Sequence, residues 1–280
     1  MPDGVQRAGG TGSLLSLRGV SRRNGLVQVL NGIDLDLPGG QVTVLLGPSG
    51  AGKTVLCRAV DGSERIDSGS ITLDGIPLRR RRRFGRGDGR GGIAPVAEPG
   101  SLPAHRTVLR NVAAGRGNGS PWRWRPGRAH EELRAPALLA RVGAADYAAH
   151  FPWELPVELR QRVAIARALA SAPAVLLVDL PTAAAAPQTP PVATSPPVAS
   201  APHAPQTPAL PALPALLRGI AADGLAVLVT TGDPGFARTA ADRVVFMEGG
   251  RIIEQGAPEE FFTTPRTARA RAFLSTTATG

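Results

Sequence analysis

The chain has 280 residues, of which 42% are apolar, and its formal net charge at pH 7 is +10. This length and composition are typical of one large globular unit with a sizeable core. The single cysteine, Cys57, excludes a disulfide within the chain, and the absence of any apolar run of about 18 residues argues against a membrane span.

The first ordered elements are expected after a flexible, glycine-rich N-terminus at residues 1–13, which lacks the apolar stretch of a secretory signal. Three short strands are expected next, at Leu14–Leu17, Val27–Leu30 and Ile33–Leu37. The β-branched and aliphatic run Gln41–Leu46 then predicts a buried central strand. A helix is expected from Lys53 to about Val60, and its apolar residues predict that Cys57 is a buried, structural thiol.

A phosphate-binding loop is predicted between this strand and this helix, in the segment Gly47, Pro48, Ser49, Gly50, Ala51, Gly52, Lys53 and Thr54. Glycines allow backbone N–H groups to curl around a phosphate, and the start of a helix favours an anion. Lys53, the only lysine of the chain, would reach the β- and γ-phosphates of a nucleotide, and the Thr54 hydroxyl would bind Mg²⁺. The strand before the motif and the helix after it make a chance glycine-rich turn the weaker interpretation.

Several further elements are expected between the loop and the middle of the chain. Ser70–Leu73 predicts a strand, and the arginine run Arg79–Arg83 predicts a solvated surface loop rather than a nucleic-acid site, because interleaved aromatic residues are nearly absent. A helix is expected from about Arg128 to Val142, kinked or split by Pro136. The helix Leu159–Ala170 should present Val163 and Ala166 on its apolar face and carry its arginines elsewhere.

The strand Ala174–Val178 is expected to end at Asp179, where a carboxylate would help to hold Mg²⁺ beside the phosphate-binding loop. Residues 183–209 are rich in Pro, Ala and Thr and predict a disordered insertion, in which His203 has no evident metal partner. Order should resume with a helix and three strands, at Leu213–Ala222, Leu225–Thr230, Val244–Phe246 and Arg251–Glu254. The alternation of strands and helices predicts an α/β fold with a mainly parallel sheet.

From Leu14 to Leu274 the chain resembles the ATP-binding subunits of ABC transporters, specifically those of polar amino-acid uptake systems. Besides the phosphate-binding loop, the resemblance is carried by segments 107–112, 160–169, 235–247 and 259–262. It implies a P-loop NTPase core with an antiparallel β subdomain and a helical subdomain at about 99–160, within a domain at 14–275 followed by a tail at 276–280. It also implies ATP and Mg²⁺ as ligands, transmembrane permease subunits as partners, and a homo- or heterodimer in which two subunits sandwich two ATP molecules.

The departures from the family pattern fall on residues with catalytic or phosphate-binding roles. The family signature Leu-Ser-Gly-Gly-Gln is replaced by Leu155-Pro156-Val157-Glu158-Leu159, and the glutamate that follows the Walker B aspartate is replaced by Leu180. Other functional positions of the family align with Asn24 (adenine-stacking aromatic), Glu98 (Q-loop glutamine), Ala186 (D-loop aspartate) and Gly232 (switch histidine). Loss of a general base typically lowers a rate by about 10²- to 10⁴-fold.

We therefore expect a subunit that binds Mg-ATP but hydrolyses it slowly or not at all, located in the cytoplasm and peripherally on the inner face of the cell membrane. An alternative is an active transport ATPase in which other groups replace the missing ones. A third interpretation, a nucleic-acid-associated ABC protein that uses the arginine run, is the least favoured. A gene product without a selected role also remains open.

Overall fold

The computed structural model describes residues 14–78, 92–116, 128–180 and 212–277. The expectations for residues 1–13, the arginine run Arg79–Arg83, the 183–209 insertion, Ala186 and His203 lie outside the described residues.

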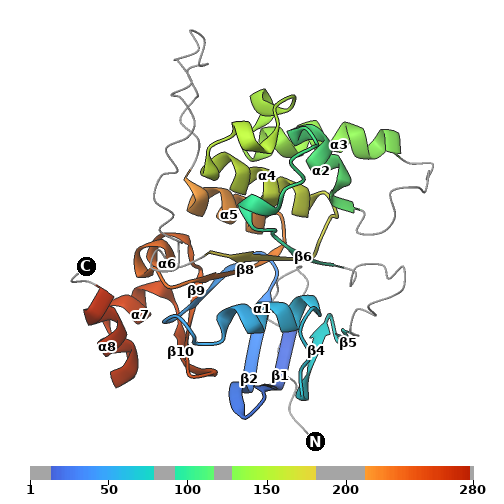
Figure 1. Ribbon diagram of the computed structural model, residues 1–280. Helices are drawn as coiled ribbons and strands as arrows, with labels where there is room; N and C mark the ends of the chain where they lie inside the picture. Colours follow the sequence, from blue (N-terminus) through green and yellow to red (C-terminus); the bar gives the residue numbers. More distant parts are fainter. Residues whose placement is uncertain (1–13, 79–91, 117–127, 181–211, 278–280) are drawn as a thin grey trace, which may run out of the picture.

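A six-stranded sheet forms the centre of the fold (Figure 1), with the strand order β10-β9-β3-β8-β7-β6. Its strands are β3 (Val42–Leu46), β6 (Ile93–Pro95), β7 (Val175–Asp179), β8 (Ala226–Thr231), β9 (Arg243–Glu248) and β10 (Arg251–Gly256). All neighbouring strands are parallel except β10, which pairs antiparallel with β9. The prediction of a mainly parallel sheet is confirmed.

The central strands are mostly apolar because both faces of the sheet are covered. In β3, Val42, Val44 and Leu46 belong to the core on one face, whereas Leu45 belongs to the core on the other. The same alternation continues through β7, β8 and β9. Strands buried on both faces read as continuous apolar runs, as the Gln41–Leu46 segment does.

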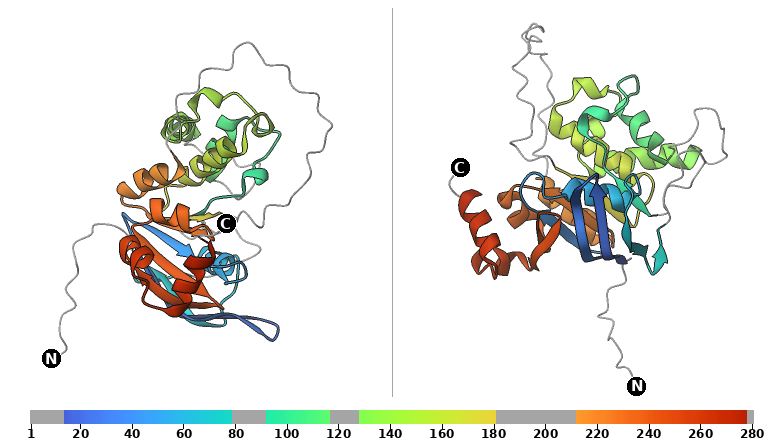
Figure 2. Two further views of the ribbon diagram at one scale, coloured as in Figure 1. Left: turned by 90° about the vertical axis from the view of Figure 1, so that its left-hand side faces the viewer. Right: turned by 60° about the horizontal axis from the view of Figure 1, so that its bottom comes forward.

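An antiparallel sheet covers one of these faces, with α1 (Lys53–Asp61) between the two sheets, and it is seen best in the right-hand view of Figure 2. Its strand order is β2-β1-β4-β5, with bounds β1 (Leu14–Asn24), β2 (Val27–Pro38), β4 (Ser68–Leu73) and β5 (Ile76–Pro77). The expectation of three short strands before residue 41 is wrong. Register shifts between Leu17 and Arg23 let β1 continue through an interruption of the apolar pattern.

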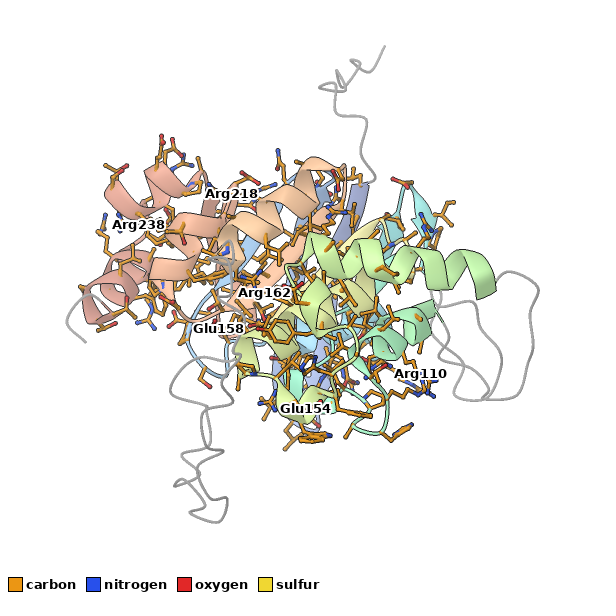
Figure 3. The ribbon with its side chains drawn as sticks, turned by 90° about the horizontal axis from the view of Figure 1, so that it is seen from above. Arg110, Glu154, Glu158, Arg162, Arg218 and Arg238 are labelled. Carbon is orange, nitrogen blue, oxygen red and sulfur yellow. The ribbon has the colours of Figure 1, made fainter. Side chains whose placement is uncertain are left out.

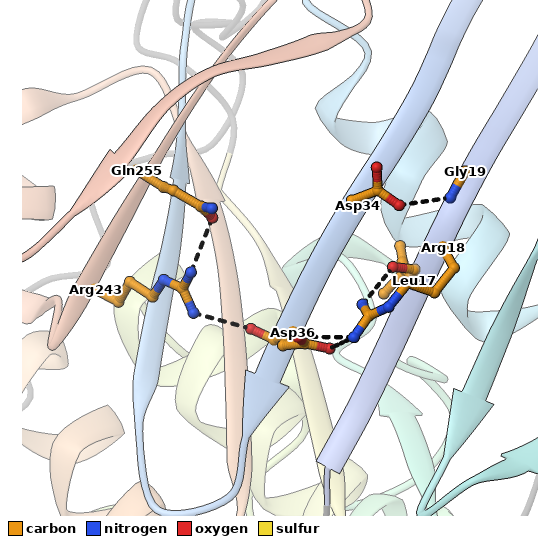
Figure 4. A network of polar contacts seen from close by, with 7 residues as sticks. All are labelled: Leu17, Arg18, Gly19, Asp34, Asp36, Arg243 and Gln255. Atoms are coloured by element: carbon orange, nitrogen blue, oxygen red, sulfur yellow. Dashed lines mark hydrogen bonds and ion pairs between the residues drawn. The ribbon is translucent and has the colours of Figure 1, made fainter. Parts of the chain in front are cut away.

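Charged groups join the antiparallel sheet to the central one (Figure 4). Arg18 pairs with the Asp36 carboxylate at 2.8 Å, and the Arg243 side chain donates to the Asp36 backbone oxygen at 3.4 Å and to Gln255 Oε1 at 2.9 Å. Asp34 accepts a bond from the Gly19 N–H on the neighbouring strand at 2.8 Å. Arg243 and Gln255 lie in β9 and β10, so this network fixes the antiparallel sheet against the edge of the central sheet.

A group of helices covers the other face of the central sheet and lies above it in Figure 1. It comprises α2 (Val108–Ala113), α3 (Arg128–Arg141) and α4 (Val157–Leu169), with the short 3-10 turns η1 (Pro99–Ser101), η2 (Ala114–Arg116), η3 (Ala145–Tyr147) and η4 (Pro152–Glu154). The Thr107 side chain caps α2 by accepting a bond from the Arg110 N–H. Pro136 does not split α3, because this exposed proline removes one backbone donor while Ala135 and Leu139 keep the helix packed on the core.

Arg162 departs from the expected amphipathic pattern of α4. The apolar face was expected to exclude it, but its side chain is only 6% exposed and donates to the Val142 backbone oxygen at 3.0 Å. Burial lowers the pKa of Arg162, and the nearby Glu158 carboxylate opposes that shift. This arginine therefore joins α4 to the end of α3 inside the helical group.

The C-terminal part adds α5 (Leu213–Ala222), α6 (Pro234–Ala240), α7 (Pro258–Thr263) and α8 (Ala268–Thr277). Figure 1 shows α7 and α8 beside β10, where Phe261 and Phe273 pack against Phe246 of β9. α8 continues to Thr277, two residues beyond the domain end expected at 275. Among the described residues, no helix has the length and apolar character that crossing a bilayer requires.

Candidate nucleotide-binding site

The segment Gly47–Gly52 connects the end of β3 to the start of α1, which is the strand–loop–helix context expected from the sequence. Two of its glycines lie where no side chain fits. A Cβ on Gly47 would lie 2.0 Å from the Met247 backbone oxygen, and one on Gly52 would lie 2.7 Å from that of Val29. Gly52 also has a φ of 98°, which favours glycine. The loop is therefore closely enclosed by neighbouring backbone.

The N-terminus of α1 is free of its own capping groups. Gly52 provides no side-chain cap, and the first turn contains no acidic residue. The first N–H groups of a helix lack partners within the helix, and its dipole places partial positive charge there. The loop and the helix start thus present backbone N–H groups with partial positive charge.

Lys53 lies within this loop. Its Nζ donates to the backbone oxygens of Gly47 at 2.6 Å and Pro48 at 2.8 Å. Burial lowers the pKa of Lys53, and the attraction of Asp179 opposes this shift. The ammonium group is therefore close to the loop amides, held by two carbonyl oxygens that a stronger acceptor such as a phosphate oxygen could replace.

Asp179, the last residue of β7, lies within hydrogen-bond reach of α1. Thr54 Oγ1 donates to Asp179 Oδ2 at 2.9 Å, and the Thr230 hydroxyl of β8 donates to the other carboxylate oxygen. The structure thus brings together the two residues that the sequence predicts as Mg²⁺ ligands. Both are exposed, so the pair is accessible to a ligand from solvent.

The donor chemistry fits Mg²⁺ together with a polyphosphate. Mg²⁺ prefers oxygen ligands and is usually held by one or two protein groups plus waters and substrate phosphates. Thr54 and Asp179 supply one hydroxyl and one carboxylate, and among the described residues no group of three or more His, Cys, Asp or Glu forms a cage of its own. Cys57, close by on α1, is buried as expected, and burial raises its pKa further above the ordinary thiol value.

Leu180 follows Asp179 directly, and nothing in its side chain can accept a proton or orient a water molecule. Its backbone N–H donates to the Thr230 backbone oxygen at 2.9 Å. Its half-buried side chain packs against the core on the helical side of the sheet. The residue after Asp179 thus has an apolar side chain that packs against apolar neighbours.

The segment Leu155–Leu159 forms the entrance to α4. Leu155 and Leu159 are buried, whereas Val157 is 59% exposed. Pro156 is the residue before the helix and has no N–H to offer, and Glu158 places a carboxylate in the first turn. Figure 3 shows Glu158 at this end of α4, with Glu154 from the preceding turn nearby. This helix start therefore carries a carboxylate in its first turn, with the Arg162 guanidinium close to it.

Three of the remaining family positions, Asn24, Glu98 and Gly232, lie within the described residues. Gly232 is buried between β8 and α6, and the next residue, Asp233, caps α6 by accepting a bond from the Gly235 N–H at 2.7 Å. Glu98 is exposed after β6, and Asn24 ends β1 opposite Val27. No histidine occupies the segment that follows β8, residues 232–233.

Sequence reasoning missed Thr230. The available signal was a hydroxyl at the end of the apolar run Ala226–Val229, since a buried hydroxyl needs a partner. Its partner depends on the register of two parallel strands, in which Asp179 lies opposite Thr230. That register is not visible in the sequence.

Comparison with known proteins agrees with the fold and identifies the family. Residues 30–183 match the ABC transporter family. The chain is 36% identical to the glutamate transport ATP-binding protein GluA of Corynebacterium glutamicum, over 93% of this chain and 98% of the relative. It is 34% identical to the glutamine transport ATP-binding protein GlnQ of Geobacillus stearothermophilus, over 91% and 96% of the two chains.

Solved structures share the fold. An ATP-binding cassette of an ABC transporter in its ADP conformation superposes with a TM-score of 0.69 at 19% identity, covering 94% of this chain and 99% of that one. A nucleotide-free cassette gives a TM-score of 0.70 at 19% identity, with coverages of 93% and 98%. The strand–loop–helix site, the two sheets with their helical group and the relatives named for amino-acid transport lead to one conclusion: this chain belongs to the ATP-binding subunits of ABC transporters.

Proposed function

We propose that the chain is the ATP-binding subunit of an ABC-type amino-acid importer, and that it binds Mg-ATP but hydrolyses it slowly or not at all. The observation that carries both parts is the contrast between an intact Gly47–Thr54 loop beside Asp179 and the apolar Leu180 next to it. In this proposal the subunit acts as a structural or regulatory component of its transporter.

The binding half rests on the loop. The site for the phosphates is formed by the enclosed glycines Gly47 and Gly52, the uncapped start of α1 and the Lys53 ammonium. Between the two glycines, Ser49, Gly50 and Ala51 supply further backbone N–H groups, whereas Pro48 has none. Thr54 and Asp179 would hold Mg²⁺, which neutralises the charge on the phosphates when bound.

The impaired hydrolysis rests on two missing groups. A water that attacks the terminal phosphate needs an acceptor for its proton or a group that orients it, and Leu180 offers neither. Gly232 has no side chain with which to contact that phosphate. The Glu158 carboxylate at the entrance to α4 would also repel a phosphate presented by a second subunit.

The assembly part of the proposal follows the relatives, two of which are named for glutamate and glutamine transport. We infer that the chain forms a homo- or heterodimer of ATP-binding subunits and binds transmembrane permease subunits at the inner face of the cell membrane, from the cytoplasm. A dimeric relative of known structure, bound to ADP and phosphate, shares this fold with a TM-score of 0.63.

Two measurements test the proposal. A fluorescent ATP analogue titrated with Mg²⁺ should bind the purified chain with a dissociation constant below the millimolar range, and release of phosphate should stay near background. Absence of binding at millimolar nucleotide contradicts the first half, and turnover of about one per second or faster contradicts the second.

The alternative, an active transport ATPase with replacement groups, is separated by Leu180→Glu with Leu180→Gln as its matched control. The carboxylate would follow Asp179 on a backbone already fixed by the bond to Thr230. If only the base is missing, the Glu variant should release phosphate faster than the Gln variant. If other groups have taken over, wild-type turnover is already substantial and the Glu variant adds nothing.

A further inference from the structure

We propose that Thr230 is a positioning residue that fixes the Asp179 carboxylate for Mg²⁺, an inference that rests on the proposed binding of Mg-nucleotide. Thr230 does not belong to the phosphate-binding loop. It acts on the metal only through the carboxylate that its hydroxyl contacts.

The strand pairing places Thr230 at this position. In the parallel pair β7–β8, Val175 to Asp179 align with Ala226 to Thr230, so the last residue of β7 lies opposite Thr230. Thr230 is completely buried, and the four residues before it in β8 are buried and apolar. A hydroxyl in such surroundings is costly unless it forms a hydrogen bond, and Asp179 supplies the acceptor.

Two hydroxyls together determine the orientation of the carboxylate. Thr230 donates to Oδ1 and Thr54 donates to Oδ2, so the two oxygens are fixed on opposite sides by β8 and α1. With Oδ1 bonded inside the sheet, Oδ2 is left facing Thr54, the predicted ligand of the ion. Loss of the Thr230 bond would let the carboxylate rotate away from that orientation.

The backbone of Thr230 contributes a second bond to the same turn. Its oxygen accepts from the Leu180 N–H at 2.9 Å, immediately after Asp179. A change of the side chain alone leaves this backbone bond in place, so substitution of the hydroxyl isolates its effect on the carboxylate. Groups that bond a ligating carboxylate typically contribute about 10- to 100-fold in metal affinity.

The experiment compares Thr230→Val and Thr230→Ser with wild type and with the control Thr43→Val. Thr43 is also buried, and it lies in the adjacent strand β3, opposite Leu228 of β8. A fluorescent ATP analogue is titrated first in excess chelator and then with increasing Mg²⁺, so that metal-free nucleotide affinity and the Mg²⁺ half-saturation are measured separately.

Thr230→Val should raise the Mg²⁺ half-saturation by about 10-fold and leave metal-free affinity unchanged. Thr230→Ser should stay near wild type, and Thr43→Val should change neither quantity. In an Asp179→Asn background Thr230→Val should have no further effect on Mg²⁺, because the orientation of the carboxylate is the only route by which it acts.

An unchanged Mg²⁺ half-saturation in Thr230→Val overturns the inference, as does an equal loss of metal-free and Mg²⁺-dependent binding. If Thr230→Val does not fold, the Ser variant decides, since a weakened Mg²⁺ response with the hydroxyl present is incompatible with the inference. Failure of the proposed function is distinct: wild type itself would then bind no nucleotide, with or without Mg²⁺.

Discussion

The starts of α1 and α4 are both helix N-termini entered from a loop, and they have opposite chemistry. At α1 the residue before the helix is Gly52, in a left-handed conformation, and no acid occupies the first turn. At α4 that residue is Pro156, in an extended conformation, and Glu158 supplies a carboxylate in the first turn. The first start is left free to bind an anion, whereas the second supplies its own.

The entrance to α8 shows what a bound anion contributes at such a position. The Glu254 carboxylate, from β10, accepts bonds from the backbone N–H groups of Arg266 and Thr267 at 2.8 and 2.9 Å and from the Thr267 hydroxyl at 2.7 Å. Here the anion comes from the chain itself. The three helix N-termini therefore differ in the anion that they meet. The start of α1 has no acidic residue in its first turn, the start of α4 has Glu158 there, and the start of α8 is bound by the Glu254 carboxylate.

The largest effect should follow from filling the α1 loop. Gly47→Ala places a Cβ 2.0 Å from the Met247 backbone oxygen, so the loop must move, nucleotide binding should be lost and the free energy of unfolding should fall by about 2–4 kcal/mol. Gly224→Ala, in the turn between α5 and β8, is the matched control outside the loop. Its Cβ meets no atom within 4 Å, and the φ of 94° should cost only about 1–2 kcal/mol. Nucleotide titration and urea unfolding measure both, and equal effects in the two variants would contradict the expectation.

The next effect concerns charge at the open helix start. Lys53→Ala should weaken ATP binding by about 10- to 100-fold, the value of a hydrogen bond to a charged group. Arg58→Ala removes an exposed cation from the last turn of the same helix and should change affinity far less. Calorimetric titration distinguishes them, and wild-type affinity in the Lys53 variant would remove the basis for a phosphate site.

A smaller effect on stability is expected at the start of α8, where the anion is the Glu254 carboxylate of the chain itself. Burial alone would raise the pKa of Glu254, but its three hydrogen-bond donors outweigh burial and hold the pKa below the ordinary glutamate value. The stabilisation is therefore complete above the unfolded-state pKa and is lost as the pH falls through the folded-state value. Glu254→Gln should lower the free energy of unfolding by about 1–3 kcal/mol at pH 7.

Urea unfolding of wild type and Glu254→Gln at pH 7 and at pH 3 checks this linkage. The difference between the two proteins should shrink on acidification, because wild type then loses the charge that the variant already lacks. A difference that stays constant over this range would show that the carboxylate contributes through packing and not through its charge.

The smallest effect is expected at α4. Glu158→Gln removes the favourable interaction of the carboxylate with the helix dipole and should lower the free energy of unfolding by about 0.3–1 kcal/mol. Because the group is exposed, the effect should diminish at 1 M salt. Thermal unfolding at low and high salt measures it, and a stabilised variant would mean that Glu158 is repelled by its surroundings.

The sequence allowed the α1 site to be predicted because its constraints are local. The strand, the glycines and Lys53 are neighbours in the chain, and a loop of this composition between an apolar strand and a helix restricts the backbone strongly. Asp179 was predicted from its place at the end of an apolar run. The mainly parallel sheet was predicted from the alternation of strands and helices along the chain.

The remaining features depend on contacts between distant segments. The bond from Thr230 to Asp179 requires the register of β7 and β8, and the burial of Arg162 requires the Val142 carbonyl at the end of α3. The length of β1 was missed because its bulges break the alternation on which strand prediction relies. The first two features depend on a partner that is distant along the chain, and the third depends on an irregular backbone.

The rarity of lysine in this protein has a practical consequence. Lys53 carries the only ε-amino group of the chain, and burial lowers the pKa of this amine. An amine-selective acylating reagent therefore has a single lysine side chain to label in this sequence. Mass spectrometry can then compare the labelling of Lys53 with and without nucleotide. Lower labelling with nucleotide indicates that the loop is occupied, and no engineered probe is needed.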